Sequence, residues 1–208
     1  MFSFQRLLGR ENEFFGPLEA SAQECVASIS ALRDILARPG EAPSLEAFAA
    51  ARRKDKEITQ RLEEMLIRTF VTPIEREDIE ELADRLYKIP KTVEKFAERF
   101  ALVVDKVQGV PFEFHAEPLE RAVQLVLAMI RGLRAGNLAE VKARQTELRT
   151  LARIADIAMA EALEPLYQRS YGPLRAVIVK DLYELLERAM ERCREAAAVI
   201  AHILIKNS

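Results

Sequence analysis

A heptad pattern of apolar residues runs through residues 79–103, which read IEELADRLYKIPKTVEKFAERFALV. The apolar side chains recur at alternating spacings of three and four residues: Ile79, Leu82, Leu86, Ile89, Val93, Phe96, Phe100 and Val103. A repeat of this period lines one stripe of an α-helix and favours left-handed packing against neighbouring helices. The stretch therefore predicts one long helix inside a helical bundle.

The same pattern returns one hundred residues later in the chain. Its members are Val179, Leu182, Leu186, Ala189, Cys193, Ala196, Ile200 and Ile203. Pro73 and Pro173 match at the same offset. We interpret the chain as a duplication, with residues 1–108 and 109–208 as two three-helix repeats packed together in one globular unit. The alternative is that two unrelated amphipathic helices happen to slide into register, which the shared proline and the equal helix count oppose.

Short breaks divide the rest of the chain into helices. Gly and Pro interrupt it at residues 39–40, 109–111 and 171–173. Residues 72–75 predict a capping box for the third helix, and residues 137–140 predict one for the fifth. We expect an all-α fold of six helices, arranged as two pseudo-repeated antiparallel three-helix bundles. The expected helices are 11–37, 44–70, 73–107, 117–135, 137–167 and 173–206.

The composition excludes several classes of function. The 31 basic and 33 acidic side chains nearly cancel, and the pI of about 5.9 is unlike that of a dedicated nucleic-acid binder. No apolar run reaches the roughly 20 residues that a membrane helix needs, and the first residues do not resemble a signal peptide. We expect a cytoplasmic protein that binds no nucleic acid and reaches the inner membrane only through a partner.

Two aspartates occupy matching places in the apolar stripes, or seams, of the second and fifth helices. Asp55 follows Phe48 and Ala51 in the second helix, and Asp156 follows Ala152 in the fifth. A buried carboxylate needs a partner, because an isolated buried charge is costly. Two alternatives stay open at this point: an ion pair with Lys or Arg, and a metal or anion site shared with the neighbouring helix. The last helix offers further carboxylates at a spacing of four residues, namely Glu187, Glu191 and Glu195.

Two segments resemble a known family. Residues 70–79, FVTPIEREDI, and residues 180–187, KDLYELLE, are similar to signatures of the PhoU-related regulators of phosphate transport. The resemblance covers nearly the whole chain and is closest to the branch that accompanies Pit-type phosphate permeases. It implies two three-helix bundles, a cytoplasmic protein that acts on a phosphate transporter or its signalling, and carboxylate-rich helix faces that can hold metal clusters.

The sequence departs from this family at the acidic positions of the first half. Tyr87, Lys88 and Lys91 replace the carboxylates that would accompany Asp55, so we expect the first-half metal site to be lost. The candidate metal ligands that persist lie in the second half: Asp156, Glu187, Glu191 and Glu195. We expect no cofactor, and at most a weak divalent-cation, iron or zinc site formed by these residues.

These observations favour a non-enzymatic regulator or accessory protein of inorganic phosphate transport that acts through protein–protein contacts. The alternative is a helical scaffold or adaptor with unrelated partners. A carboxylate-metal enzyme of bundle type needs Glu-x-x-His pairs, which neither His115 nor His202 provides, so we expect no catalytic and no cofactor-binding residue.

We also expect self-association as a homodimer. Four aromatic residues cluster near the N-terminus: Phe2, Phe4, Phe14 and Phe15. Four such rings are more than one small core is expected to cover, and an exposed aromatic patch marks an interface. The alternative is that they fold back onto the end of the bundle.

Overall fold

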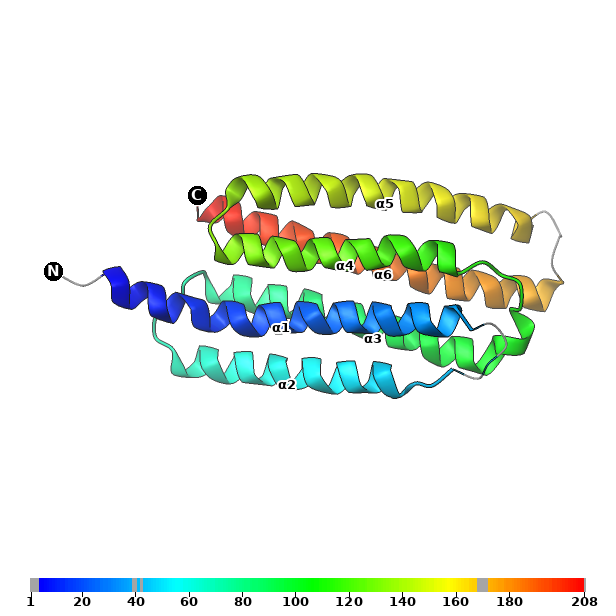
Figure 1. Cartoon of the computed structure of the whole chain (residues 1–208), viewed down its shortest axis with the longest axis horizontal. Helices are drawn as coiled ribbons and strands as arrows, with labels where there is room; N and C mark the ends of the chain where they lie inside the picture. The colour runs from blue at the N-terminus through cyan, green and yellow to red at the C-terminus, as the bar shows by residue number, and fades with distance from the viewer. Residues whose placement is uncertain (1–3, 39–40, 42, 168–171, 208) are drawn as a thin grey trace.

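The computed structural model of the chain consists of six long helices (Figure 1). It describes residues 4–38, 41, 43–167 and 172–207, with side chains from residue 13 onward. No strand occurs in these ranges, so the predicted all-α class is confirmed. The helices are α1 Phe4–Leu36, α2 Glu46–Arg68, α3 Arg76–Val103, α4 Glu113–Arg134, α5 Leu138–Tyr167 and α6 Pro173–Lys206, and a short 3-10 helix, η1 Val104–Lys106, follows α3.

The two halves of the chain share one packing scheme. In the first half α1, α2 and α3 contact one another, and in the second half α4, α5 and α6 do the same. The halves meet where α1 packs on α4 and α3 packs on α6, which leaves α2 and α5 on opposite sides of the molecule (Figure 1). This arrangement agrees with a duplication, and the superposition of residues 1–108 on 109–208 stays a prediction.

Both predicted heptad seams are buried. In α3 every seam residue from Ile79 to Phe100 is at most 6% exposed, and Val103 at the end of the helix is partly buried. In α6 all eight predicted seam residues are buried, including Cys193. The heptads therefore pack α3 and α6 against the centre of the molecule, as the spacing predicts.

The predicted capping box at the start of α3 is wrong. The helix begins at Arg76, three residues later than expected, and Glu75 is its N-cap with no side-chain capping bond. The Arg76 guanidinium instead donates to the carbonyl oxygen of Leu66 at 2.6 Å and to that of Thr69. These carbonyls end α2 without partners inside the helix, so Arg76 caps the preceding helix.

The predicted cap of α5 at Asn137 is confirmed. The Asn137 Oδ1 accepts a hydrogen bond from the Glu140 N–H at 3.1 Å. The Glu140 carboxylate accepts one from the side-chain amide of Asn137, because the Asn137 backbone N–H donates to Gly132 instead. Gly136 precedes Asn137 with a φ of +64°, a conformation that glycine adopts without a steric penalty. The α4–α5 turn is thus determined by local residues, whereas the α2–α3 turn depends on Arg76.

The N-terminal aromatic cluster is only partly covered by the structure. Phe14 and Phe15 are 1% and 7% exposed, so these two rings belong to the core. Phe2 and the side chain of Phe4 lie outside what the structure describes. Two of the four rings on which the expectation of a homodimer rests are therefore unavailable for an interface, and the homodimer stays a prediction.

No helix in the described part of the chain is both long and apolar enough to span a bilayer.

Candidate functional site

Asp55 lies on α2 and is completely buried against α1. Its Oδ1 accepts a hydrogen bond of 2.5 Å from the Ser21 hydroxyl, and its Oδ2 has no hydrogen-bond partner among the described residues. Burial raises the pKa of Asp55 to about 6, although the Ser21 hydrogen bond and the charge of Arg52 act in the opposite direction. The direct partner of this carboxylate is therefore a hydroxyl, rather than the Lys, Arg or metal that the sequence suggests.

An arginine occupies the neighbouring α2–α3 face. The Arg52 Nε donates to Glu94 at 2.9 Å, one of its terminal nitrogens donates to the Tyr87 hydroxyl at 2.9 Å, and its charge lies 4.3 Å from the centre of the Tyr87 ring. Lys88 pairs with Asp84 at 2.5 Å, and Lys91 lies over the Tyr87 ring at 5.7 Å. A fixed guanidinium thus stands beside Tyr87, and this arrangement supports the expectation that the first-half metal site is lost.

Cys25 compensates for the proline inside α3. Pro90 has no N–H, so the carbonyl of Leu86, four residues earlier, lacks its helical donor. The Cys25 thiol of α1 is completely buried and donates to this carbonyl, with sulfur and oxygen 3.4 Å apart. Burial raises the pKa of Cys25 well above its ordinary value, which keeps it a thiol and a donor. Cys25 therefore stabilises α3 through a specific contact with its backbone.

The carboxylates of the second half are bound by arginines. Arg194 of α6 donates to both oxygens of Asp156 on α5, at 2.9 and 3.3 Å, and its Nε lies 2.7 Å from Glu191. Glu195 accepts from Arg192 at 2.7 Å and from Arg85 of α3 at 3.2 Å. These contacts tie α5 to α6 and α3 to α6 through charge pairs.

Glu187 is separate from that arginine network. Together with Asp156 it lines a shallow pocket between α5 and α6, which His115 and Met190 also border. His115 is 7% exposed and edge-on to Tyr183, with ring centres 5.0 Å apart, and burial lowers its pKa. Of the candidate metal ligands, only Asp156 and Glu187 therefore border one pocket, and Asp156 already binds Arg194.

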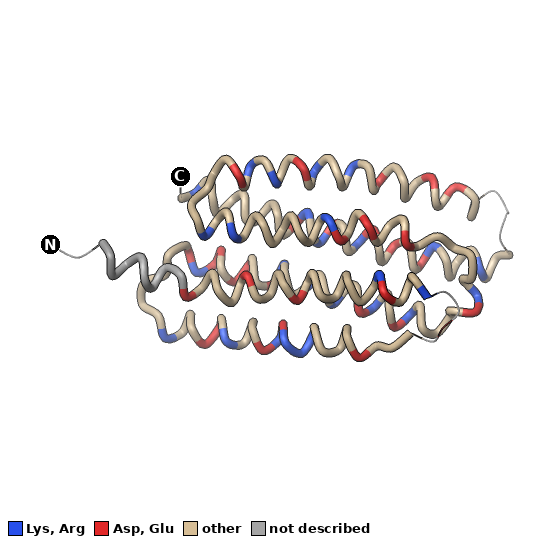
Figure 2. The backbone as a smooth tube through the Cα atoms, in the orientation of Figure 1, with Lys and Arg blue, Asp and Glu red and all other residues tan. Residues whose placement is uncertain are grey.

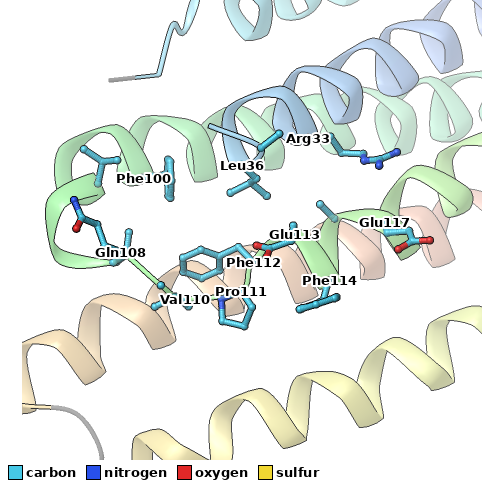
Figure 3. A pocket seen from close by; sticks show the side chains of 15 residues that line it. Arg33, Leu36, Phe100, Gln108, Val110, Pro111, Phe112, Glu113, Phe114 and Glu117 are labelled. Carbon is cyan, nitrogen blue, oxygen red and sulfur yellow. The ribbon is translucent and has the colours of Figure 1, made fainter. Parts of the chain in front are cut away.

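A larger cavity lies beside the first turn of α4, where α1 ends and α3 connects to α4 (Figure 3). Its volume is about 540 Å³. Leu36 and Phe100 face it from the ends of α1 and α3, and Val110, Pro111 and Phe112 form the other wall (Figure 3). The sequence marked residues 109–111 as a boundary between halves and gave no signal that they line a cavity.

Similarity searches place the chain among known proteins. No family model matches it. The chain is 24% identical over 214 residues to the "Putative pit accessory protein" of Rhizobium meliloti (strain 1021), covering 98% of both chains. It is also 24% identical over 151 residues to the UPF0111 protein YkaA of Bacillus subtilis (strain 168), covering 69% of this chain and 70% of that one.

Two crystal structures share the fold. One is a PhoU-like protein from Shewanella oneidensis MR-1, with a TM-score of 0.82, 16% identity, and coverage of 92% of this chain and 99% of that one. The chain has a PhoU-like fold. A second structure from that organism, a "putative PhoU-like phosphate regulatory protein", gives a TM-score of 0.75 at 14% identity, with 93% and 100% coverage. The predicted resemblance to PhoU-like proteins of the Pit-associated branch is confirmed, and none of these PhoU-like relatives has the name of an enzyme.

A metal cluster of the kind that the resemblance implies does not fit the residues of this chain. Among the described residues, no three His, Cys, Asp or Glu side chains are placed to hold a metal ion. Arg194 stands between Asp156 and Glu191, where a cation would need both carboxylates. We therefore propose that arginine replaces the metal in the second half as well.

Metal analysis of protein purified without chelator checks this proposal. We expect substoichiometric iron and zinc, because an arginine bound to Asp156 at 2.9 Å competes with a cation for the same oxygens. The double variant Asp156→Ala with Glu187→Ala is the control. Stoichiometric metal in the wild-type protein that disappears in this variant would contradict the proposal.

Proposed function

We propose that this PhoU-like chain is a non-enzymatic accessory or regulatory protein of inorganic phosphate transport. The main support for this proposal is the similarity to a pit accessory protein over 98% of both chains, together with the PhoU-like fold. In this proposal the chain works in the cytoplasm and binds a phosphate permease, or a signalling partner of that permease, at the inner membrane.

The surface of the bundle supports a role in protein–protein contact. Basic and acidic residues alternate along the helices, with no described helix carrying one sign alone, which supports the expectation of no nucleic-acid partner (Figure 2). Large apolar side chains are exposed near the two ends of the bundle. They include Ile67, Phe70 and Val71 around the α2–α3 turn, and Leu102 and Phe114 near the α3–α4 connection. Exposed apolar groups of this kind mark contact surfaces.

The test combines transport with copurification. In a strain that lacks the chain, we expect the initial rate of radioactive phosphate uptake to differ from that of the parent strain and to return when the gene is supplied. We also expect the affinity-tagged chain, crosslinked in native membranes, to copurify with a phosphate permease identified by mass spectrometry. A tagged unrelated helical bundle at equal abundance is the control.

The scaffold alternative gives the opposite result. If uptake is unchanged in the deletion strain and no phosphate permease copurifies, the chain is an adaptor with other partners, and the transport proposal is wrong.

A further inference from the structure

We infer that the cavity between α1, α3 and α4 binds an apolar side chain of a basic cytoplasmic segment of the permease. This inference rests on the proposed function and adds the site and the chemistry of the contact. The cavity lies at the end of the bundle, where α1 ends and α3 connects to α4, and the exposed ring of Phe114 stands at its mouth (Figure 3).

Several of the side chains that line the cavity are apolar and firmly held. Phe112, Val107 and Phe100 are 1%, 3% and 6% exposed, so each is anchored in the core while one part of it faces the cavity. The Phe112 ring packs edge-on against Phe96 at 5.7 Å and against Phe100 at 6.1 Å. The volume of about 540 Å³ falls in the usual range for ligand pockets, roughly 300–1,000 Å³. Such a cavity favours an apolar group that enters from outside.

Phosphate itself does not suit this cavity. Among the described lining residues Arg33 alone is positively charged, and it already pairs with Glu120. The nearby guanidinium of Arg175 donates to the carbonyl oxygen of Gln108 at 2.7 Å, so it too is engaged by the protein. An anion would meet apolar walls and carboxylates, which oppose its desolvation.

The rim of the cavity is acidic. Glu113 and Glu117 lie one turn apart at the start of α4, and both are exposed. Neither has an ion-pair partner within 4.0 Å in the part of the chain that the structure describes. Because both are exposed and neither is paired among the described residues, both carboxylates are available to a cation outside the protein.

Charge complementarity selects the occupant. A segment with an apolar anchor beside Lys or Arg fits an apolar cavity with two carboxylates at its mouth. Cytoplasmic segments next to membrane spans carry an excess of Lys and Arg, so a permease presents this chemistry where the chain would meet it. An anionic lipid surface would be repelled by the same carboxylates, which disfavours direct docking on the membrane.

Fluorescence anisotropy with short labelled peptides tests the pocket. The probe has a central Phe-Leu pair between two Lys-Arg-Lys triplets, and its matched controls carry Glu in place of the basic residues or Ser in place of the apolar pair. We expect the basic apolar probe to bind, and the Glu113→Lys plus Glu117→Lys variant to bind it at least about tenfold more weakly, or about 1.4 kcal/mol. Equal binding by the acidic probe, or by the double variant, would overturn the inference.

Two further variants separate the pocket from general charge. The Glu77→Lys plus Glu80→Lys variant makes the same charge change at the start of α3, at the opposite end of the bundle, and we expect it to bind the probe as the wild-type protein does. Ala37→Trp places a large ring at the exposed edge of the cavity and should weaken binding without altering charge. Loss of binding in the α3 control to the same extent would assign the effect to overall charge and overturn the inference.

The full-length permease then distinguishes the two proposals. If the permease copurifies with the wild-type chain and equally with the Glu113→Lys plus Glu117→Lys variant, the pocket inference is wrong and the proposed function stands. If no permease copurifies with the wild-type chain, the pocket inference is wrong. If phosphate uptake is also unchanged in the deletion strain, the proposed function is wrong too. Concentration-dependent self-association that disappears in the double variant would assign the pocket to a second copy of the chain and likewise overturn the inference.

Discussion

Between pH 4 and pH 8 the free energy of unfolding of the Asp55→Asn variant is expected to rise by about 2–3 kcal/mol relative to that of the wild-type protein. Burial raises the pKa of Asp55 from 3.8 to about 6. The folded wild-type protein therefore holds this proton more tightly than the unfolded chain does. Its stability is fully present below pH 4 and is lost as the pH rises through 6, whereas asparagine has no proton to lose.

Denaturant titrations of both proteins at several pH values measure this difference. Asn keeps the shape of the side chain, and its oxygen can still accept the hydrogen bond from the Ser21 hydroxyl. Glu57→Gln removes a charge from the exposed face of the same helix and serves as the control for charge alone. If the free energies of unfolding of Asp55→Asn and the wild-type protein change in parallel with pH, the pKa of Asp55 is not raised in the folded protein.

Ser21→Ala removes the hydrogen-bond donor of the same pair. The Ser21 hydroxyl is the hydrogen-bond donor to the Asp55 carboxylate, and it opposes the effect of burial on the pKa of this group. Its removal should therefore make the decline in stability with pH steeper. A shallower decline would mean that another group controls the pH dependence.

The helices and their buried faces were predictable because they follow from local spacing. A heptad pattern has only one face to bury, so the seams of α3 and α6 were placed correctly from Ile79 and from Val179 onward. The start of α3 was not, because Thr72 and Pro73 satisfy a local capping pattern, whereas the helix begins only at Arg76. The Arg76 side chain binds the carbonyl oxygens of Leu66 and Thr69 at the end of α2, and the capping pattern gives no sign of this contact.

The candidate site shows the same limit. The sequence placed Asp55 and Asp156 at matching seam positions, yet Asp55 is completely buried and the Asp156 side chain is 45% exposed. The difference depends on their partners, since Ser21 of α1 covers Asp55 and Arg194 of α6 draws Asp156 outward. The two arginines that occupy the inter-helix faces, Arg52 and Arg194, were missed because charge pairs depend on which helices are neighbours.

The cavity at the end of the bundle could not be foreseen from the sequence. It exists because α1 ends near Leu36 while α3 continues through η1 before the chain turns into α4, and the space between them is only partly filled. The lengths of the helices determine the size of this cavity. An error of three residues in a predicted helix end, such as the one at Arg76, is large enough to remove the cavity from the prediction. Gly109, which has a φ of +79°, and Pro111 were the local signals of the turn itself.

Replacing Phe112 with alanine is expected to lower the free energy of unfolding by about 3–5 kcal/mol. Phe112 is 1% exposed and connects the two halves of the chain, because its ring packs on Phe96 of α3 at 5.7 Å and on Tyr183 of α6 at 4.9 Å. Truncation removes these ring contacts and opens a void continuous with the cavity, which the surrounding helices can fill only in part. The midpoint of denaturant unfolding at constant slope measures the loss.

Phe114→Ala is the matched control, two residues away on the same turn. Its ring is 68% exposed, so the same truncation should change the free energy of unfolding by only about 0.5 kcal/mol. If the pocket inference is correct, Phe114→Ala should nevertheless weaken the basic apolar peptide, since this ring borders the mouth of the cavity. Equal destabilisation by the two variants would mean that Phe112 does not hold the halves together, and that the cavity wall is less firmly anchored than its burial indicates.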